Sequence, residues 1–123
     1  DQTAIPLKFY SGVAKYSLKD YSAAINDFIK AKEHSPYNVH VLNNLGSTYY
    51  NTKKYSEAIQ SYKELLTYYP WFSEAAANLA VAYIQNGEPD DAIELLQHDT
   101  IGADRKNEII NYLKSIGVAL STG

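Results

Sequence analysis

Apolar residues recur along the chain in stretches of helical spacing, and short polar segments separate the stretches. A helix is predicted over residues 37–51, because Leu42, Leu45 and Tyr49 fall three or four positions apart and share one face. A second helix is predicted over residues 55–68 on the same grounds. Only three polar residues lie between the two, so the pattern predicts a helical hairpin.

This hairpin pattern repeats with a period of 34 residues. Gly12 recurs as Gly46 and Ala80, Ala24 as Ala58 and Ala92, Ile25 as Ile59 and Ile93, and Pro36 as Pro70. Such a fixed period indicates an array of one supersecondary unit whose copies bury their apolar faces by stacking. We expect copies at about 3–36, 37–70 and 71–99. A capping helix at about 104–120 should then cover the third hairpin.

Small residues and helix-breaking residues mark how each hairpin closes. Gly46 and Ala58 offer almost no side chain, so we expect the two helices of the middle hairpin to cross there, where a larger residue would overpack the contact. In the third copy, Gly87 can adopt the left-handed conformation that ends a helix, and Pro89 suits the first turn of the next helix.

The middle copy reads Leu42-x2-Leu45-Gly46-x2-Tyr49, then Ala58-x3-Tyr62, then Pro70. It resembles the tetratricopeptide repeat, whose pattern is Trp-x2-Leu-Gly-x2-Tyr, Ala-x3-Phe and Pro. The first copy keeps only the second-helix part of this pattern, and the third lacks the closing proline. The resemblance covers about residues 3–99. It implies an all-α, right-handed solenoid of three antiparallel hairpins plus the capping helix, which form one domain over 1–123.

The resemblance also implies a concave groove that is lined by the first helix of every hairpin and receives a peptide or helix of a partner protein. The groove positions carried over to this chain are Phe9, Val13, Tyr16, His40, Asn43, Ser47, Tyr50, Asn51, Glu74, Ala77, Val81, Ile84 and Gln85. The expected apolar anchors are Phe9, Tyr16, Tyr50, Val81 and Ile84. The side-chain amides of Asn43, Asn51 and Gln85 are expected to form hydrogen bonds with the partner's backbone. We therefore expect a partner segment with apolar or aromatic anchor residues.

Some members of the family hold the acidic C-terminal tails of chaperones through Lys, Arg and Asn in the groove. The basic residues that this mode requires are missing here. Phe9 and Val13 stand at the groove places of the first copy, and Glu74 and Ala77 at those of the third. Glu74 would repel an acidic tail, so a partner of that kind is not expected.

The first helix carries two apolar stripes. The expected core face comprises Leu7, Tyr10, Ala14 and Leu18, and the second stripe comprises Phe9, Val13 and Tyr16. A second stripe needs a cover, which could be a partner peptide, another copy of the chain, a preceding repeat, or packing within the array itself. The alternative to a peptide-binding adaptor is therefore a structural or self-associating array, or an assembly or regulatory appendage of a larger protein, including a membrane or envelope protein.

Composition narrows the function classes. With 123 residues, 46% hydrophobic and 20% charged, the chain suits one folded domain. Its net charge of −3 gives no positive field for nucleic acid. No apolar stretch is long enough to insert in a membrane, and no secretion signal is present, so the compartment stays open. The absence of methionine and the start at Asp1 predict processing or excision from a longer chain.

The sequence shows no parts of a catalytic or metal centre. The three histidines, His34, His40 and His98, lie in different copies without metal-ligand spacing, and there is no cysteine. Phosphate-binding glycine loops and nucleophile elbows are also missing. We therefore expect no enzyme activity, no cofactor and no metal, and a protein that works by binding another protein.

Overall fold

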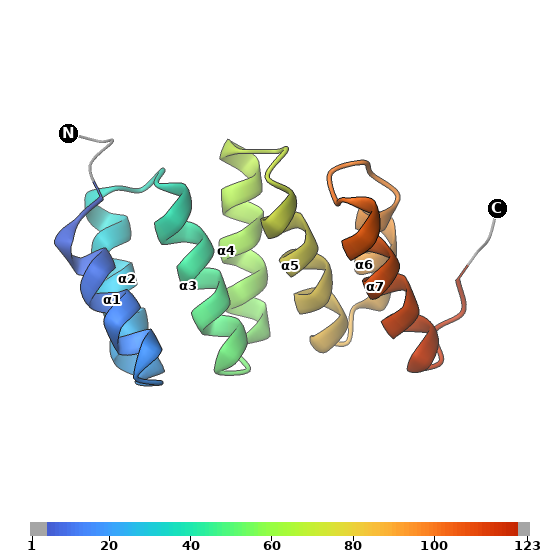
Figure 1. Ribbon diagram of the computed structural model, residues 1–123, viewed down its shortest axis with the longest axis horizontal. Coiled ribbons are helices and arrows are strands. Elements are labelled where there is room, and N and C mark those ends of the chain that lie inside the picture. The colour runs from blue at the N-terminus through green and yellow to red at the C-terminus, as the bar shows by residue number, and fades with distance from the viewer. Residues whose placement is uncertain (1–4, 121–123) are drawn as a thin grey trace.

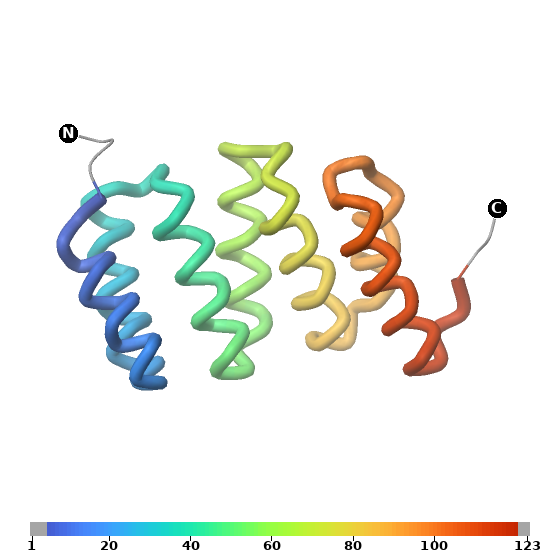
Figure 2. Tube along the Cα trace, viewed as in Figure 1, coloured from blue at the N-terminus to red at the C-terminus, as the bar shows by residue number. Residues whose placement is uncertain are grey.

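The computed structural model describes residues 5–120, so the first two residues of the expected first copy lie outside the described part. Its regular structure is helical throughout: α1 (Leu7–Ser17), α2 (Tyr21–His34), α3 (Val39–Asn51), α4 (Tyr55–Tyr68), α5 (Ser73–Gln85), α6 (Pro89–Leu96) and α7 (Ala103–Ser115). Figure 1 shows α1, α3, α5 and α7 in one row, with α2, α4 and α6 behind it. The expected all-α repeat solenoid is confirmed. The trace in Figure 2 follows the hairpins α1–α2, α3–α4 and α5–α6 in succession along the described residues.

Side chains with oxygen acceptors set where two helices begin. The Oδ1 atom of Asn38 accepts hydrogen bonds from the backbone nitrogens of His40, at 2.9 Å, and Val41, at 3.2 Å. Asn38 is therefore the N-cap, and α3 begins at Val39 and not at residue 37 as the pattern predicted. Asp20 caps α2 in the same way, through the backbone nitrogen of Ala23.

The turn that ends each first helix uses one residue with positive φ at a constant repeat position. Lys19 and Lys53 both have φ of 62°, and Gly87 has φ of 76°. After α3, the backbone nitrogen of Lys54 then bonds to the carbonyl oxygen of Tyr49 at 2.9 Å. This arrangement satisfies carbonyl groups at the end of the helix, and glycine is the residue that tolerates it best.

The capping helix ends earlier than the expected residue 120. Gly117, with φ of 87°, follows the last turn, and its backbone nitrogen bonds to the carbonyl oxygen of Lys114 at 3.1 Å. The backbone nitrogen of Val118 bonds back to Leu113 at 3.0 Å. These two bonds form the glycine motif that terminates helices, so α7 stops at Ser115.

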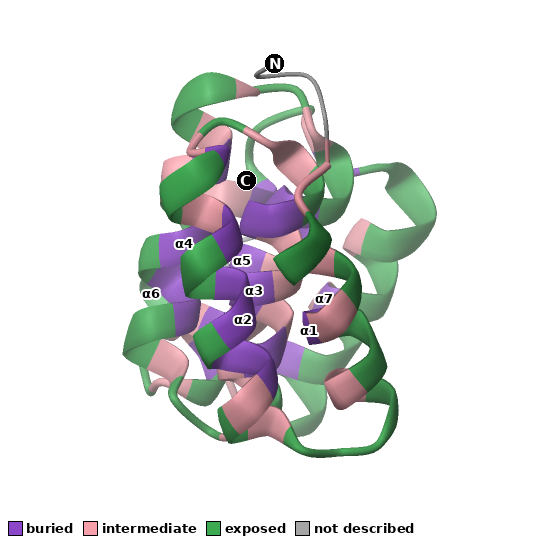
Figure 3. Ribbon diagram, turned by 90° about the vertical axis from the view of Figure 1, so that its left-hand side faces the viewer, coloured by how far each residue is buried: buried purple, intermediate pink, exposed green. Residues whose placement is uncertain are grey.

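Each hairpin closes where a large side chain of its second helix meets a small residue of its first. A Cβ atom at Gly46 would lie 2.7 Å from Cε1 of Tyr62, so the close approach expected at Gly46 is confirmed. The Tyr62 hydroxyl lies 3.0 Å from Oγ of Ser47, and burial raises the pKa of Tyr62 to about 12. Gly12 meets Phe28 in the same way in the first hairpin. Figure 3 shows the buried residues gathered between the helix layers.

A buried carboxylate joins the two helices of the first hairpin. Asp27 is 3% exposed, and its Oδ2 atom accepts hydrogen bonds from Nζ of Lys15 at 2.7 Å and Oγ of Ser11 at 2.6 Å. Nζ of Lys8 lies 3.7 Å from the other carboxylate oxygen. The hydrogen bond from Lys15, followed by that from Ser11, holds the pKa of Asp27 below its ordinary value of 3.8.

The prediction of which face of the first helix is buried in the core is wrong. Leu7 is 86% exposed, Tyr10 56% and Leu18 80%. The half-buried residues are instead Phe9 and Tyr16, which pack against the buried cluster of the first hairpin. Helical spacing identified both stripes, but it could not tell which of them the second helix would cover.

Candidate functional site

The predicted groove positions lie along the row of helices α1, α3 and α5, and α7 continues this row at its C-terminal end (Figure 1). We call the surface along these four helices the first-helix face. In the N-terminal half of the first-helix face, α1 contacts α3 through two pairs of predicted residues. The rings of Phe9 and His40 have centroids 6.4 Å apart, and Nδ2 of Asn51 donates a hydrogen bond to the Tyr16 hydroxyl.

All three amides that were expected to read a peptide backbone donate to a neighbouring helix of the row. Besides the bond from Asn51, Nδ2 of Asn43 donates to Oε1 of Glu74 at 3.4 Å, and Nε2 of Gln85 donates to the Tyr112 hydroxyl at 3.1 Å. The Oδ1 atom of Asn43 is buried and has no hydrogen-bond partner. An unpaired buried acceptor costs free energy.

A cavity of about 300 Å³ opens where α3, α5 and α7 meet on this face. Four of the predicted groove residues line it: Tyr50, Val81, Ile84 and Gln85. The other lining residues come from α7: Arg105, Glu108, Ile109 and Tyr112. The sequence resemblance stopped before these residues, although their spacing of three and four positions marks one face of a helix.

The two charged side chains that line this cavity, Arg105 and Glu108, form an ion pair with each other. Nη1 of Arg105 lies 3.0 Å from Oε2 of Glu108, and both side chains are about half exposed or more. The Tyr50 ring meets the Tyr55 ring edge-on at 5.3 Å, and burial is the main cause that raises the pKa of Tyr50. The cavity therefore combines an apolar wall with amide and hydroxyl groups and no dominant charge.

The remaining predicted positions are spread unevenly over the face. Ala77 and Ile84 are only 3% and 8% exposed, so most of their surface is packed in the core. Ser47 directs its hydroxyl to Tyr62. Glu74 and Ala77 line a second cavity of about 390 Å³ with the start of α7. Val13, in the middle of α1, is 37% exposed.

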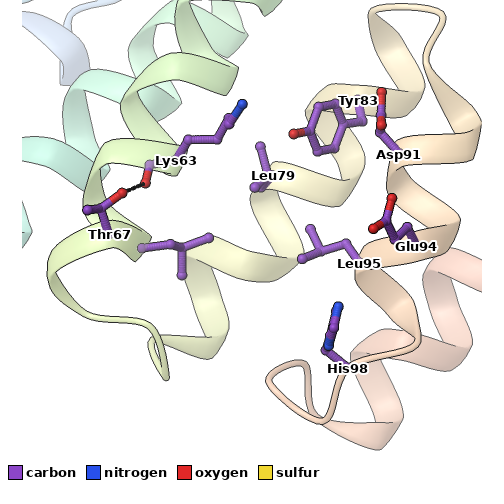
Figure 4. A pocket seen from close by; sticks show the side chains of 9 residues that line it. Lys63, Thr67, Leu79, Tyr83, Asp91, Glu94, Leu95 and His98 are labelled. Carbon is purple, nitrogen blue, oxygen red and sulfur yellow. Dashed lines mark hydrogen bonds between the residues drawn. The ribbon is translucent and has the colours of Figure 1, made fainter.

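A further cleft of about 380 Å³ lies in the second layer, between α4 and α6 (Figure 4). Leu79 and Leu95 contribute apolar surface, and Asp91 and Glu94 line the α6 side. Burial, and then the nearby carboxylates, raise the pKa of Tyr83. Within residues 5–120 no group of histidine, aspartate and glutamate side chains is placed to hold a metal ion, and no helix is long and apolar enough to cross a membrane.

Stacked hairpins whose first helices form a continuous row define a helical-repeat protein. This fold serves protein–protein interaction. Residues 52–109 match the family model described as Tetratricopeptide repeat. This part of the chain therefore resembles tetratricopeptide repeats.

Solved structures share this fold. A mutant of MamA is 25% identical, with a TM-score of 0.69 over 84% of this chain and 70% of that one. The Sgt2 TPR domain from Aspergillus fumigatus is 20% identical, with a TM-score of 0.76 over 89% of this chain and 76% of that one. The first TPR of Spaghetti (RPAP3), bound to an HSP90 peptide, is 18% identical, with a TM-score of 0.76 over 94% and 95%.

The chain spans 61% of the length of another MamA structure, to which it is 24% identical. No curated protein sequence matches this chain.

Proposed function

We propose that the chain is a peptide-binding adaptor whose first-helix face receives an apolar or aromatic segment of a partner protein. The observation that supports this most is the cavity between α3, α5 and α7. Its volume of about 300 Å³ is in the range of small ligand pockets and suits one large apolar side chain of the partner. Tyr50 and Val81 offer this side chain apolar surface.

The amides of Gln85, which lines the cavity, and of Asn51 fit a role in reading the partner's backbone. Gln85 is held by Tyr112, and Asn51 by Tyr16, so each amide is already oriented by a neighbouring helix. Orienting a side chain before binding lowers the entropy lost in the complex.

The charges on the face favour a neutral partner segment over an acidic one. Glu74 lies on α5, and Arg105 is engaged by Glu108 at 3.0 Å. The tetratricopeptide structure of Spaghetti is bound to the HSP90 peptide SRMEEVD, whose last residues are acidic. The lysines and arginines that could hold such residues are missing from the predicted positions on α1, α3 and α5.

The test uses a displayed library of random peptides, from which binders to the chain are selected and synthesised. We expect the selected peptides to share an aromatic or large apolar residue. Tyr50→Glu should then weaken their binding at least about tenfold in calorimetry, because a charged group would replace an aromatic ring that lines the cavity. The helical circular dichroism should not change.

Tyr37→Glu is the matched control. Tyr37 is 53% exposed and contacts Tyr68 of α4, away from the first-helix face, so this variant should bind as the parent chain does. Equal affinity of the Tyr50→Glu variant and the parent chain would refute the proposed site, and failure to select any peptide would count against peptide binding as such.

One observation favours the alternative of a structural or self-associating array, in which the chain stacks on further repeats or on itself. The apolar stripe of α1 that holds Leu7 and Leu18 is exposed, whereas the stripe with Phe9 and Tyr16 is half buried. Association through this stripe does not compete with peptide binding, because the stripe lies beside the first-helix face and not in its cavity.

A further inference from the structure

The cleft between α4 and α6 has a counterpart of about 350 Å³ one repeat earlier, between α2 and α4. We call the earlier one the first inter-hairpin cleft and the later one the second inter-hairpin cleft. The chain itself supplies both walls of each cleft, so neither is left open by the position of an end of the array. Their lining residues correspond at a step of 34 residues: Ile29 and Lys63, Lys32 and Leu66, Leu45 and Leu79, Tyr49 and Tyr83, Glu57 and Asp91, Gln60 and Glu94, Ser61 and Leu95, and Glu64 and His98.

An ion pair of the chain's own residues spans the first inter-hairpin cleft. Nζ of Lys32, on α2, lies 2.7 Å from Oε2 of Glu64, on α4. The two side chains are only 33% and 30% exposed, so both are partly removed from water. In the first cleft, the chain thus supplies both a long cationic side chain and the carboxylate that binds it.

The second inter-hairpin cleft lacks this pair. Leu66 stands at the position of Lys32, and His98 at that of Glu64. The carboxylates of the second cleft belong instead to Asp91 and Glu94, on the α6 wall. Within residues 5–120, neither of these carboxylates forms an ion pair. The second cleft therefore has acidic groups but no cation of its own that binds them.

We propose that the second inter-hairpin cleft binds an arginine or lysine side chain of a partner protein, which takes the place that Lys32 has in the first cleft. The aliphatic stem of such a side chain needs apolar surface. Leu66, Leu79 and Leu95 line the cleft and offer this surface. The cleft lies in the second layer of helices, so the proposal is independent of peptide binding to the first-helix face.

The charged end of the partner's side chain would lie beside two carboxylates and an aromatic ring. Figure 4 shows Asp91 and Glu94 on α6, with the Tyr83 ring next to Asp91. Carboxylates form charge-assisted hydrogen bonds with guanidinium and ammonium groups, and a tyrosine ring attracts the same cations. A neutral or acidic side chain would gain neither interaction.

Lys63 opposes this binding. It lines the second cleft from α4, where the first cleft has Ile29, and its side chain extends toward the α6 wall (Figure 4). Within the described residues, its Nζ atom forms no ion pair. Two carboxylates face this single ammonium group, so the cleft keeps an excess of negative charge and attracts a cation.

Nuclear magnetic resonance of the isotope-labelled chain tests the proposal with two short peptides. One is an alanine peptide with a central arginine, and in the other citrulline replaces the arginine, which keeps the shape of the side chain and removes its charge. The titration is made at about pH 8, where an unperturbed histidine is neutral. At millimolar concentration the arginine peptide should shift amide signals of α4 and α6, and the citrulline peptide should bind at least about threefold more weakly.

Variants of the cleft give the expected changes opposite signs. Asp91→Asn combined with Glu94→Gln should weaken binding of the arginine peptide at least about threefold, and Lys63→Gln should strengthen it about twofold or more. Glu57→Gln is the matched control, because Glu57 has the position of Asp91 in the first cleft, and it should bind as the parent chain does. All four side chains are exposed, so circular dichroism should not change.

A further variant, Leu66→Lys with His98→Glu, rebuilds the ion pair of the first cleft in the second. The chain's own lysine should then exclude the arginine peptide and abolish the shifts on α4 and α6. Equal binding of the arginine and citrulline peptides overturns the proposal, and so does an arginine peptide that shifts no signal on these two helices. Binding that Glu57→Gln weakens while the Asp91 and Glu94 variant keeps it would also overturn the proposal.

Discussion

Replacing Gly46 by alanine tests whether the close approach in the middle hairpin is as tight as the structure shows. The added Cβ atom would lie 2.7 Å from Cε1, 2.9 Å from Cζ and 3.0 Å from Cδ1 of Tyr62. The ring has little room to yield, because the Tyr62 side chain is only 2% exposed and its hydroxyl is held by Ser47. We therefore expect Gly46→Ala to destabilise the fold.

Two opposing effects set the size of the loss. Overpacking a core contact costs about 1–3 kcal/mol. Alanine is better than glycine inside a helix by about 1 kcal/mol, and this gain offsets part of that cost. The free energy of unfolding should therefore fall by up to about 2 kcal/mol. Equilibrium urea unfolding of the two proteins measures the difference.

The third hairpin provides the compensating change. It has Ala80 and Leu96 at the repeat positions of Gly46 and Tyr62, and both lie in one buried cluster. Leucine lacks the ring edge that meets the Cβ atom, so Gly46→Ala should cost less in a Tyr62→Leu background. A coupling energy of about 1–2 kcal/mol in this double-mutant cycle is expected. If Gly46→Ala stabilises the chain, or the two changes simply add, the packing argument fails.

Two further predictions concern backbone strain and charge. Lys53→Gly should raise the free energy of unfolding by about 1 kcal/mol in urea denaturation, because Lys53 has φ of 62° where the third hairpin has Gly87. The control Lys54→Gly, at an ordinary φ of −90°, should give no gain, and a larger gain there would contradict the argument. The pKa of Asp27 is lowered by folding, so its contribution to stability is present above the unfolded value of 3.8 and is lost as the pH falls through the folded value. The free energy of unfolding, measured at a series of pH values below about 4, should therefore fall more steeply with decreasing pH for the parent chain than for Asp27→Asn. The same pH dependence in both proteins would rule this out.

Much of the secondary structure could be predicted from the sequence. The second helix of the middle copy was expected over 55–68, and α4 spans Tyr55–Tyr68. The polar turn after α3, the proline in the first turn of α6 and the glycine after α5 also lie where their residue types predict. These features depend on bonds between residues close in sequence, so local patterns carry them.

The candidate site was only partly predictable. The repeat period placed Tyr50 and Val81 on first helices, and the structure brings both to the same cavity. It could not include Arg105 or Tyr112, because the loop before α7 breaks the period and the position of that helix depends on its packing against α5. Nor could it show that Gln85 is bonded to Tyr112.

The sequence by itself determined the helices, the hairpins and their number, because helical spacing and the 34-residue period are properties of the chain alone. Only the tertiary structure decided which face of each helix is buried. The first helix shows this most clearly, since both of its stripes are apolar and yet Phe9 is packed while Leu7 is exposed. The burial of a stripe depends on which neighbouring helix lies against it, and that neighbour comes from a distant part of the chain or from another molecule.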